Sequence, residues 1–166
     1  MQLKADPQKL FQQILESKGL KFTKQRGEIL DYLLKAKKHL TPEEIYRDLN
    51  REDPSLGRAT IFRTLHLLED SGFANKISFP DGRQGYEHKF AKPHHDHMIC
   101  IECSDVIEFS NATIERLQNQ ISRGFQFTPL WHRHEIFGKC RKCKDDKPHK
   151  KFIRMSASAV SLKKKE

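Results

Sequence analysis

His94-His95-Asp96-His97-Met98-Ile99-Cys100-Ile101-Glu102-Cys103 is the stretch around which the second half of this 166-residue chain is organised. It joins a run of imidazole and carboxylate side chains directly to a Cys-x-x-Cys pair. A second pair, Cys140 and Cys143, accounts for the other two of the four cysteines. Two such pairs with no cysteine left over favour a tetrahedral zinc site over a redox dithiol or buried free thiols. We therefore predict a structural zinc site formed by Cys100, Cys103, Cys140 and Cys143.

The histidine run is expected to be extended, so that successive side chains point to opposite faces. His95 and His97 would then face one side, and His94 and Asp96 the other. Histidine and carboxylate ligands suit Fe²⁺, Zn²⁺, Mn²⁺ or Co²⁺ and do not select strongly among them. Two other interpretations stay open, a solvated polar run and a catalytic metal centre. We find no separate general base, nucleophile motif or Gly-rich phosphate loop, which disfavours an enzyme.

The composition favours a soluble protein with small cores, because hydrophobic residues make up 36% and charged residues 32% of the chain. The N-terminus has no apolar run, and no stretch approaches the roughly 18 apolar residues of a membrane span. We therefore expect a cytoplasmic protein without a membrane partner, in which metal binding is favoured over disulfides. The net charge of +9 is compatible with an anionic partner but does not locate a nucleic-acid surface.

The first half has the pattern of short capped helices followed by a hairpin. Helices are expected from Pro7 to Gly19, from Thr23, from the capping box Thr41-Pro42-Glu43-Glu44, and from Arg58 to Gly72. Two strand candidates, 73–79 and 85–90, flank the turn Pro80-Asp81-Gly82. This order predicts a winged helix-turn-helix, in which the last helix before the hairpin enters the major groove of DNA.

The outward positions of that last helix carry side chains suited to DNA. Phosphates and base edges accept hydrogen bonds from such donors, and an aromatic ring can contact thymine methyls. The residues are Arg58, Thr60, Phe62, Arg63 and His66. The alternative is an ordinary core helix with a solvated polar face. Phe62 on an otherwise polar face favours the DNA-binding interpretation.

The second half is expected to form a small α/β unit. Strand candidates lie at 98–101, 106–109, 125–130 and 135–137, with a helix over 111–123. A unit of this size has little core and would gain from both a zinc ion and a partner subunit. We predict a winged-helix domain over 1–90, a hinge over 91–93, an α/β domain over 94–145 and a basic flexible tail over 146–166. The fold class is α+β.

Residues 94–109 closely resemble the signature of the ferric uptake regulator (Fur) family of metal-dependent transcriptional regulators. The resemblance extends through 57–63, 68–72 and 137–140, and covers roughly residues 10–143. The family consists of dimeric bacterial repressors with an N-terminal winged helix and a C-terminal α/β dimerisation domain. The resemblance therefore implies a homodimer that binds double-stranded DNA at an AT-rich palindromic operator. It also implies a repressor that senses Fe²⁺ and controls metal-uptake genes.

Carried over position by position, the resemblance implies three metal sites. The four cysteines match the structural zinc site. A regulatory site that bridges the two domains is matched by His39, Glu87, His95, His97 and Glu108. A further site within the dimerisation domain is matched by His94, Asp96, Glu115 and His132. Arg63 and Phe62 fall where the family contacts DNA, and Lys21 falls where it has a basic residue near the minor groove.

The chain departs from the family pattern at a few positions. Phe62 stands where a tyrosine is usual, Ser104 replaces a glycine, and the stretch between Glu87 and His94 is slightly longer. Peroxide sensors of the family generally carry aspartate at the position of Glu108, so this glutamate favours a sensor of metal availability. Peroxide-sensing, zinc-sensing and manganese-sensing functions stay open as alternatives, with a metal-dependent hydrolase behind them.

Overall fold

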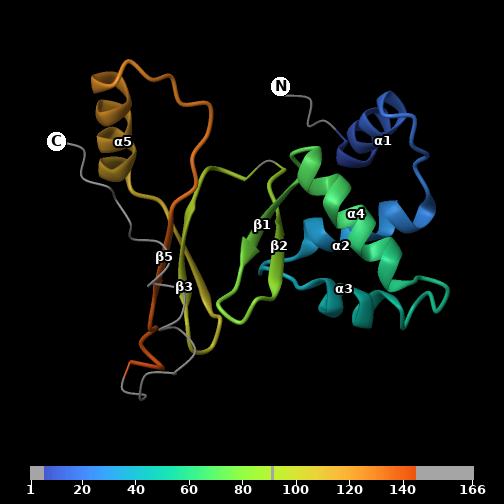
Figure 1. The fold of residues 1–166 in the computed structure, drawn as a ribbon. Coiled ribbons are helices and arrows are strands. Elements are labelled where there is room, and N and C mark those ends of the chain that lie inside the picture. The colour runs from blue at the N-terminus through green and yellow to red at the C-terminus, as the bar shows by residue number, and fades with distance from the viewer. Residues whose placement is uncertain (1–5, 91, 145–166) are drawn as a thin grey trace. The chain divides into compact units, whose positions relative to one another are not determined.

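The computed structural model describes residues 6–90 and 92–144, which form two compact units that divide between Pro93 and His94 (Figure 1). The predicted tail, 146–166, and Ala91 of the predicted hinge lie outside the described residues. The helices are combined with a two-stranded antiparallel sheet and a three-stranded mixed sheet, which gives an α+β fold. Over the described ranges, no helix combines the length and apolar character needed to cross a bilayer.

Four helices build most of the first unit. They are α1 (Pro7–Ser17), α2 (Lys24–Lys35), α3 (Pro42–Leu49) and α4 (Arg58–Asp70). The start of α1 is fixed by Asp6, whose Oδ1 accepts a hydrogen bond from the Gln8 backbone N–H at 3.0 Å. The first turn of α2 is capped by the Thr23 hydroxyl in the same way. The predicted helices are therefore confirmed, with their predicted starts.

The four helices enclose one hydrophobic core. The apolar stripe of α4, formed by Ile61, Leu65 and Leu68, is completely buried. The opposite side of α4 stays exposed, since a helix buries only one stripe against its neighbours. The remaining fully buried members of the core include Phe11, Leu15, Ile29, Leu30, Leu33 and Ile45. Burial of these side chains fixes α4 with its polar face outward.

A two-stranded wing follows α4. β1 (Ala74–Ser78) pairs antiparallel with β2 (Gln84–His88), and Gly82 closes the turn with a φ of 87°. A short bridge attaches β2 to the chain before α3, because Leu40 and Tyr86 exchange two backbone N–H···O hydrogen bonds of 2.8 Å each. This bridge brings the residues next to it, His39 and Glu87, side by side.

The capping box of α3 gives a first testable prediction. Thr41 Oγ1 accepts from the Glu44 N–H at 3.2 Å, and Glu44 Oε2 accepts from the Thr41 N–H at 2.7 Å. Burial alone would raise the pKa of Glu44, but the Thr41 N–H, the Lys38 ammonium and the Thr41 hydroxyl hold it below its usual value. The carboxylate therefore stabilises the fold at neutral pH, and this contribution is lost as the pH falls through the lowered pKa.

Thr41→Ala is expected to lower the free energy of unfolding by about 1–2 kcal/mol, because it removes a cap and breaks the box. Chemical denaturation monitored by circular dichroism would measure the loss. Thr23→Ala is the matched control, since Thr23 caps α2 through one long bond of 3.4 Å to Arg26 N–H and forms no box. Equal losses in the two variants would contradict a special role for the box.

The second unit is a three-stranded sheet with one helix. Its strands are β4 (Val106–Phe109), β3 (Asp96–Cys100) and β5 (Glu135–Gly138), in that spatial order. β3 lies at the centre, antiparallel to β4 and parallel to β5. The helix α5 (Ala112–Gly124) connects β4 to β5. The histidine run therefore enters the central strand, where both neighbours can supply further ligands.

The prediction of a strand over 125–130 is wrong, because these residues form an irregular segment after α5. Gln126 has a φ of 52°, which interrupts an extended conformation, and Pro129 has no backbone N–H to donate to a sheet. The apolar side chains that favoured a strand are instead on the surface, with Leu130 92% and Phe125 83% exposed. Leu117 and Ile121 of α5 are also exposed. The second unit thus presents a large uncovered apolar surface.

Candidate metal sites

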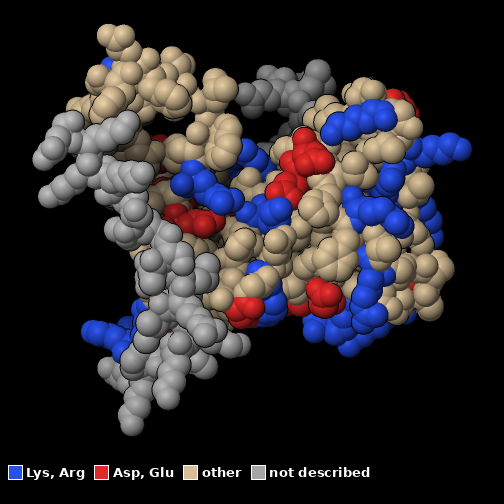
Figure 2. Space-filling view, viewed as in Figure 1, with Lys and Arg blue, Asp and Glu red and all other residues tan. Residues whose placement is uncertain are grey.

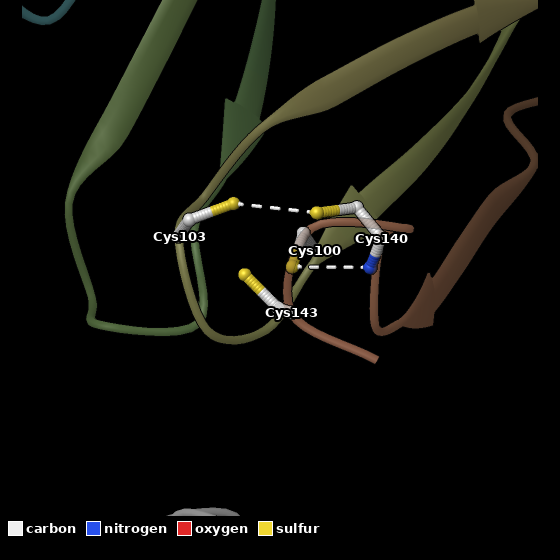
Figure 3. Close-up of side chains that lie close together, drawn as sticks. All are labelled: Cys100, Cys103, Cys140 and Cys143. Atoms are coloured by element: carbon white, nitrogen blue, oxygen red, sulfur yellow. Dashed lines mark hydrogen bonds between the residues drawn. The ribbon is translucent and has the colours of Figure 1, made fainter. Parts of the chain in front are cut away.

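The four cysteines meet at one end of the sheet in the second unit. Parallel pairing of Cys100 with Gly138 aligns the ends of β3 and β5, so that the turns that follow them lie together. Each turn is closed by its own backbone hydrogen bond, Ser104 N–H to Cys100 O and Cys143 N–H to Cys140 O, both 3.0 Å. Figure 3 shows the four sulfur atoms pointing toward one another. The structure thus brings the four predicted cysteines together in one cluster.

The spacing of the sulfur atoms fits zinc. Cys103 Sγ and Cys140 Sγ are 3.7 Å apart, and all four sulfurs lie within 4.8 Å of one another. Thiolates at 2.3 Å from a tetrahedral Zn²⁺ would be about 3.8 Å apart. A disulfide would need about 2.05 Å, and all four cysteines are free. The cluster therefore has the size of a tetrathiolate zinc site.

The thiols are electrostatically unequal. Burial alone would raise the pKa of Cys100, but the backbone N–H groups of Cys140, Cys103 and Glu102 lower it to about 6. The Cys140 N–H reaches Cys100 Sγ at 3.3 Å. The pKa of Cys143 is raised instead, first by burial and then by hydrogen bonds with the other three sulfurs. Four adjacent thiolates repel one another, and a bound Zn²⁺ removes this conflict.

A second cluster in the same unit combines two histidines and two carboxylates. His94 Nε2 lies 3.4 Å from Asp96 Oδ1 and 3.3 Å from Glu115 Oε1. His132 Nε2 lies 3.9 Å and 3.4 Å from the same two oxygens. Glu115 is positioned in the first turn of α5, which begins where Asn111 Oδ1 accepts from the Thr113 and Ile114 N–H groups. The structure thus brings together all four residues of the predicted additional site.

Unsatisfied polar atoms indicate that this cluster suits a cation. Asp96 is 1% exposed, and neither of its carboxylate oxygens has a hydrogen-bond partner among the described residues. The same holds for Glu115 Oε1 and His132 Nε2 within the described part of the chain. Buried polar atoms are normally paired, so a convergent set without hydrogen-bond partners is the arrangement expected of ligands for a divalent ion. These residues therefore fit a metal.

The five predicted regulatory ligands are divided between the two units, two in the first and three in the second. In the first unit His39 Nε2 lies 3.7 Å from Glu87 Oε1, which also accepts from Asn75 Nδ2 at 3.3 Å. The other oxygen of Glu87 pairs with Lys92 Nζ at 2.9 Å. In the second unit His95 Nε2 lies 3.8 Å from Glu108 Oε2, and the His95 and His97 ring centroids are 5.0 Å apart. The predicted alternation of the histidine run is confirmed within that unit.

The predicted DNA-contacting residues lie on the outer side of α4 and near the start of α2. Arg58, Phe62, Arg63 and His66 are exposed, Thr60 is partly buried, and Lys21 is exposed. The Arg58 guanidinium stacks over the Tyr46 ring at 4.3 Å. Figure 2 shows Lys and Arg side chains spread over the visible face of this helical region. Phe62 is 41% exposed, as a contact residue would be.

The sequence did not lead us to predict one histidine beside the second cluster, His134. His134 Nδ1 lies 3.8 Å from Asp96 Oδ2. Its spacing from His132 is the same i, i+2 spacing as that of His95 and His97. In an extended segment this spacing places two side chains on one face, so the signal was present in the sequence.

Comparisons with known proteins identify the family of this chain. The family model described as "Ferric uptake regulator family" matches residues 17–137. The chain is 42% identical over 140 residues to the ferric uptake regulation protein of Campylobacter jejuni, covering 82% of this chain and 88% of that protein. A solved structure of the Helicobacter pylori ferric uptake regulator, described as having three functional metal binding sites, is 29% identical with a TM-score of 0.76. The match covers 87% of this chain and 99% of that one.

A second solved structure widens the range of metals among the relatives. It is a zinc-bound manganese uptake regulator, 35% identical with a TM-score of 0.58, and the match covers 78% of this chain and 98% of that one. The relatives therefore include proteins named for iron and for manganese.

Proposed function

Because the chain belongs to the ferric uptake regulator family, we propose that it is a DNA-binding repressor that senses Fe²⁺ and controls metal-uptake genes in the bacterial cytoplasm. As a member of this family it is a metal-responsive transcription regulator and not an enzyme, which removes the hydrolase alternative. It holds a structural Zn²⁺ and a regulatory divalent cation. One observation carries the proposal: His39 and Glu87 pair in the winged-helix unit, while His95, His97 and Glu108 gather in the other.

The proposed mechanism follows from this division of the ligands. One ion bound by all five residues would fix the two units relative to each other. In a two-fold dimer this fixes the spacing of the two α4 helices, which must match half-sites about one DNA turn apart. Without the ion the units keep their own folds, since each has its own hydrogen-bonded elements. The metal would act by selecting the DNA-binding arrangement.

The uncovered apolar surface of the second unit supports a homodimer. Leu117, Ile121, Phe125, Leu130 and Trp131 are each at least half exposed. Large apolar side chains exposed in this number usually mark an interaction site. A second copy of the chain would cover it, and a two-fold partner is the usual solution for a regulator that reads palindromic DNA.

The exposed side of α4 supports DNA binding. Arg63 offers donors for phosphate or guanine, and Phe62 offers apolar contact to thymine methyls, which suits an AT-rich palindromic operator. Lys21 and Arg58 add phosphate-binding charge from the same unit. The phenolic hydroxyl that is usual at position 62 is absent here, so apolar contact alone acts at that point.

Arg63→Ala is expected to weaken operator binding by about 10-fold or more, because one direct DNA contact is worth about 1–3 kcal/mol. Fluorescence anisotropy with the Mn²⁺-loaded protein on an AT-rich palindrome would measure this loss. Arg116→Ala on α5 is the matched control, since that arginine belongs to the second unit. Unchanged affinity in Arg63→Ala would contradict the assignment of α4 as the recognition helix.

The nature of the signal is tested by adding Fe²⁺, Mn²⁺ or Zn²⁺ anaerobically to zinc-loaded protein and then adding peroxide. Tight DNA binding with Fe²⁺ or Mn²⁺ that survives peroxide would support a sensor of metal availability. Binding that peroxide abolishes irreversibly with Fe²⁺ but not with Mn²⁺ would identify a peroxide sensor despite Glu108. Activation by Zn²⁺ alone or Mn²⁺ alone would identify the corresponding metal sensor. No metal-dependent DNA binding would overturn the proposal.

A further inference from the structure

Asp96 of the additional cluster faces histidines with both of its carboxylate oxygens. Oδ1 faces His94 Nε2 and His132 Nε2, two of the predicted ligands. Oδ2 faces His134 Nδ1 at 3.8 Å. The residue is 1% exposed, and neither Oδ2 nor His134 Nδ1 has a hydrogen-bond partner among the described residues. A cation at the cluster would satisfy Oδ1 and leave Oδ2 in need of a donor.

The sheet holds His134 next to this second oxygen. The His97 N–H donates to the His134 carbonyl at 3.2 Å, immediately before the β3–β5 pairing begins at His97 and Glu135. On the other side of β3, Asp96 pairs with Phe109. The Phe109 and His134 ring centroids are 6.1 Å apart with an interplanar angle of 73°, so the two rings meet edge to face. Backbone pairing and this ring contact together fix where the imidazole lies.

The geometry separates His134 from the ligands themselves. His94, Asp96, Glu115 and His132 each offer an atom within 4.8 Å of the other three, and His134 is not part of that group within the described ranges. Its Nδ1 lies 3.8 Å from Asp96 Oδ2, whereas the two histidines of the cluster lie near Oδ1. A movement of about 0.8 Å would bring Nδ1 and Oδ2 to the usual hydrogen-bond distance of about 3.0 Å.

We propose that His134 is a positioning residue for the additional metal site, donating its Nδ1–H to Asp96 Oδ2 so that Oδ1 is directed at the cation. The inference rests on the proposed binding of a divalent metal by the four clustered residues. Partners that orient a ligating carboxylate typically contribute 10–100-fold to metal affinity. His134 therefore contributes to affinity without contacting the ion.

The test measures Co²⁺ binding to the full zinc-loaded chain by its visible absorption spectrum. All proteins carry Glu108→Ala, which removes one ligand of the regulatory set. The absorption of the additional site is defined as the part of the Co²⁺ spectrum that is lost when His94→Ala is introduced. His134→Leu is expected to lower the Co²⁺ affinity of this site 10–100-fold while leaving the spectrum at saturation unchanged. His134→Asn, whose amide N–H₂ can replace the Nδ1–H donor, is expected to restore affinity to within a few-fold.

His88→Leu is the matched control, because His88 is a histidine on β2 of the first unit and is expected to leave Co²⁺ affinity unchanged. Full affinity in His134→Leu, with the site still abolished by His94→Ala, would overturn the role of His134 and leave the metal site standing. A changed spectrum in His134→Leu would make it a ligand and overturn the positioning role. Absorption that His94→Ala leaves untouched would overturn the site and the inference together.

Discussion

Cys140→Ser is expected to release the structural zinc and to unfold the second unit. A structural zinc site provides roughly 10–16 kcal/mol of apparent binding free energy, which is realised as folding. Whole domains have only about 5–15 kcal/mol of net stability. The strands β3 and β5 end at this cluster, and many apolar side chains of the unit stay exposed. A unit with so little core should not stay folded once the zinc is lost.

Zinc content and thermal unfolding would measure the effect of Cys140→Ser. The parent should retain its zinc through gel filtration, whereas the variant should lose it. The helical signal of the first unit should persist, since its core is made of its own residues. Thr128→Ala, an exposed substitution in the same unit, is the control and should keep both zinc and melting temperature. A Cys140→Ser protein that melts like the parent would show that the cluster is not structural.

Local chemistry made much of the fold predictable. The box at Thr41 and Glu44, the buried stripe of α4 and the two Cys-x-x-Cys turns each depend on residues within a few positions of one another. At that range, spacing and side-chain type determine the outcome with little influence from the rest of the chain. The alternation of His95 and His97 against His94 and Asp96 was predictable for the same reason.

Features that depend on distant parts of the chain were harder to predict. Residues 125–130 have the composition of a strand, but Gln126 and Pro129 prevent pairing and the apolar side chains remain on the surface. His134 acquires a role only because β5 lies parallel to β3 and places it beside Asp96. Likewise, the Leu40–Tyr86 bridge brings His39 and Glu87 together, and no local sequence pattern predicts this bridge. Their pairing was implied by family resemblance and not by spacing.

The three clusters should respond differently to a cation. Thiolates that repel one another until a metal binds favour nearly permanent occupancy by zinc. The His94 cluster is complete within one unit, so a metal there can stabilise that unit without changing its relation to the other. Only the predicted regulatory set, which includes His39, has residues in both units. Among the three, this is the site at which metal binding is expected to change DNA affinity.

His39→Ala is therefore expected to uncouple DNA binding from the regulatory metal while leaving a folded, zinc-loaded dimer. Shifting a two-state equilibrium from 1:99 to 99:1 needs about 5.5 kcal/mol of differential metal affinity. We expect Mn²⁺ to strengthen operator binding of the parent by about 100-fold and that of the variant by only a few-fold, measured by anisotropy titration.

His88→Ala is the matched control for His39→Ala, because His88 lies directly after Glu87 on β2, outside the ligand set, with Nδ1 3.3 Å from the Phe90 carbonyl. It should keep the full Mn²⁺ effect. The His39 imidazole is the only predicted regulatory ligand besides Glu87 that the winged-helix unit supplies. If His39→Ala still responded to Mn²⁺ like the parent, coupling through an ion shared by the two units would be wrong. The metal would then have to act within the second unit, through the dimer alone.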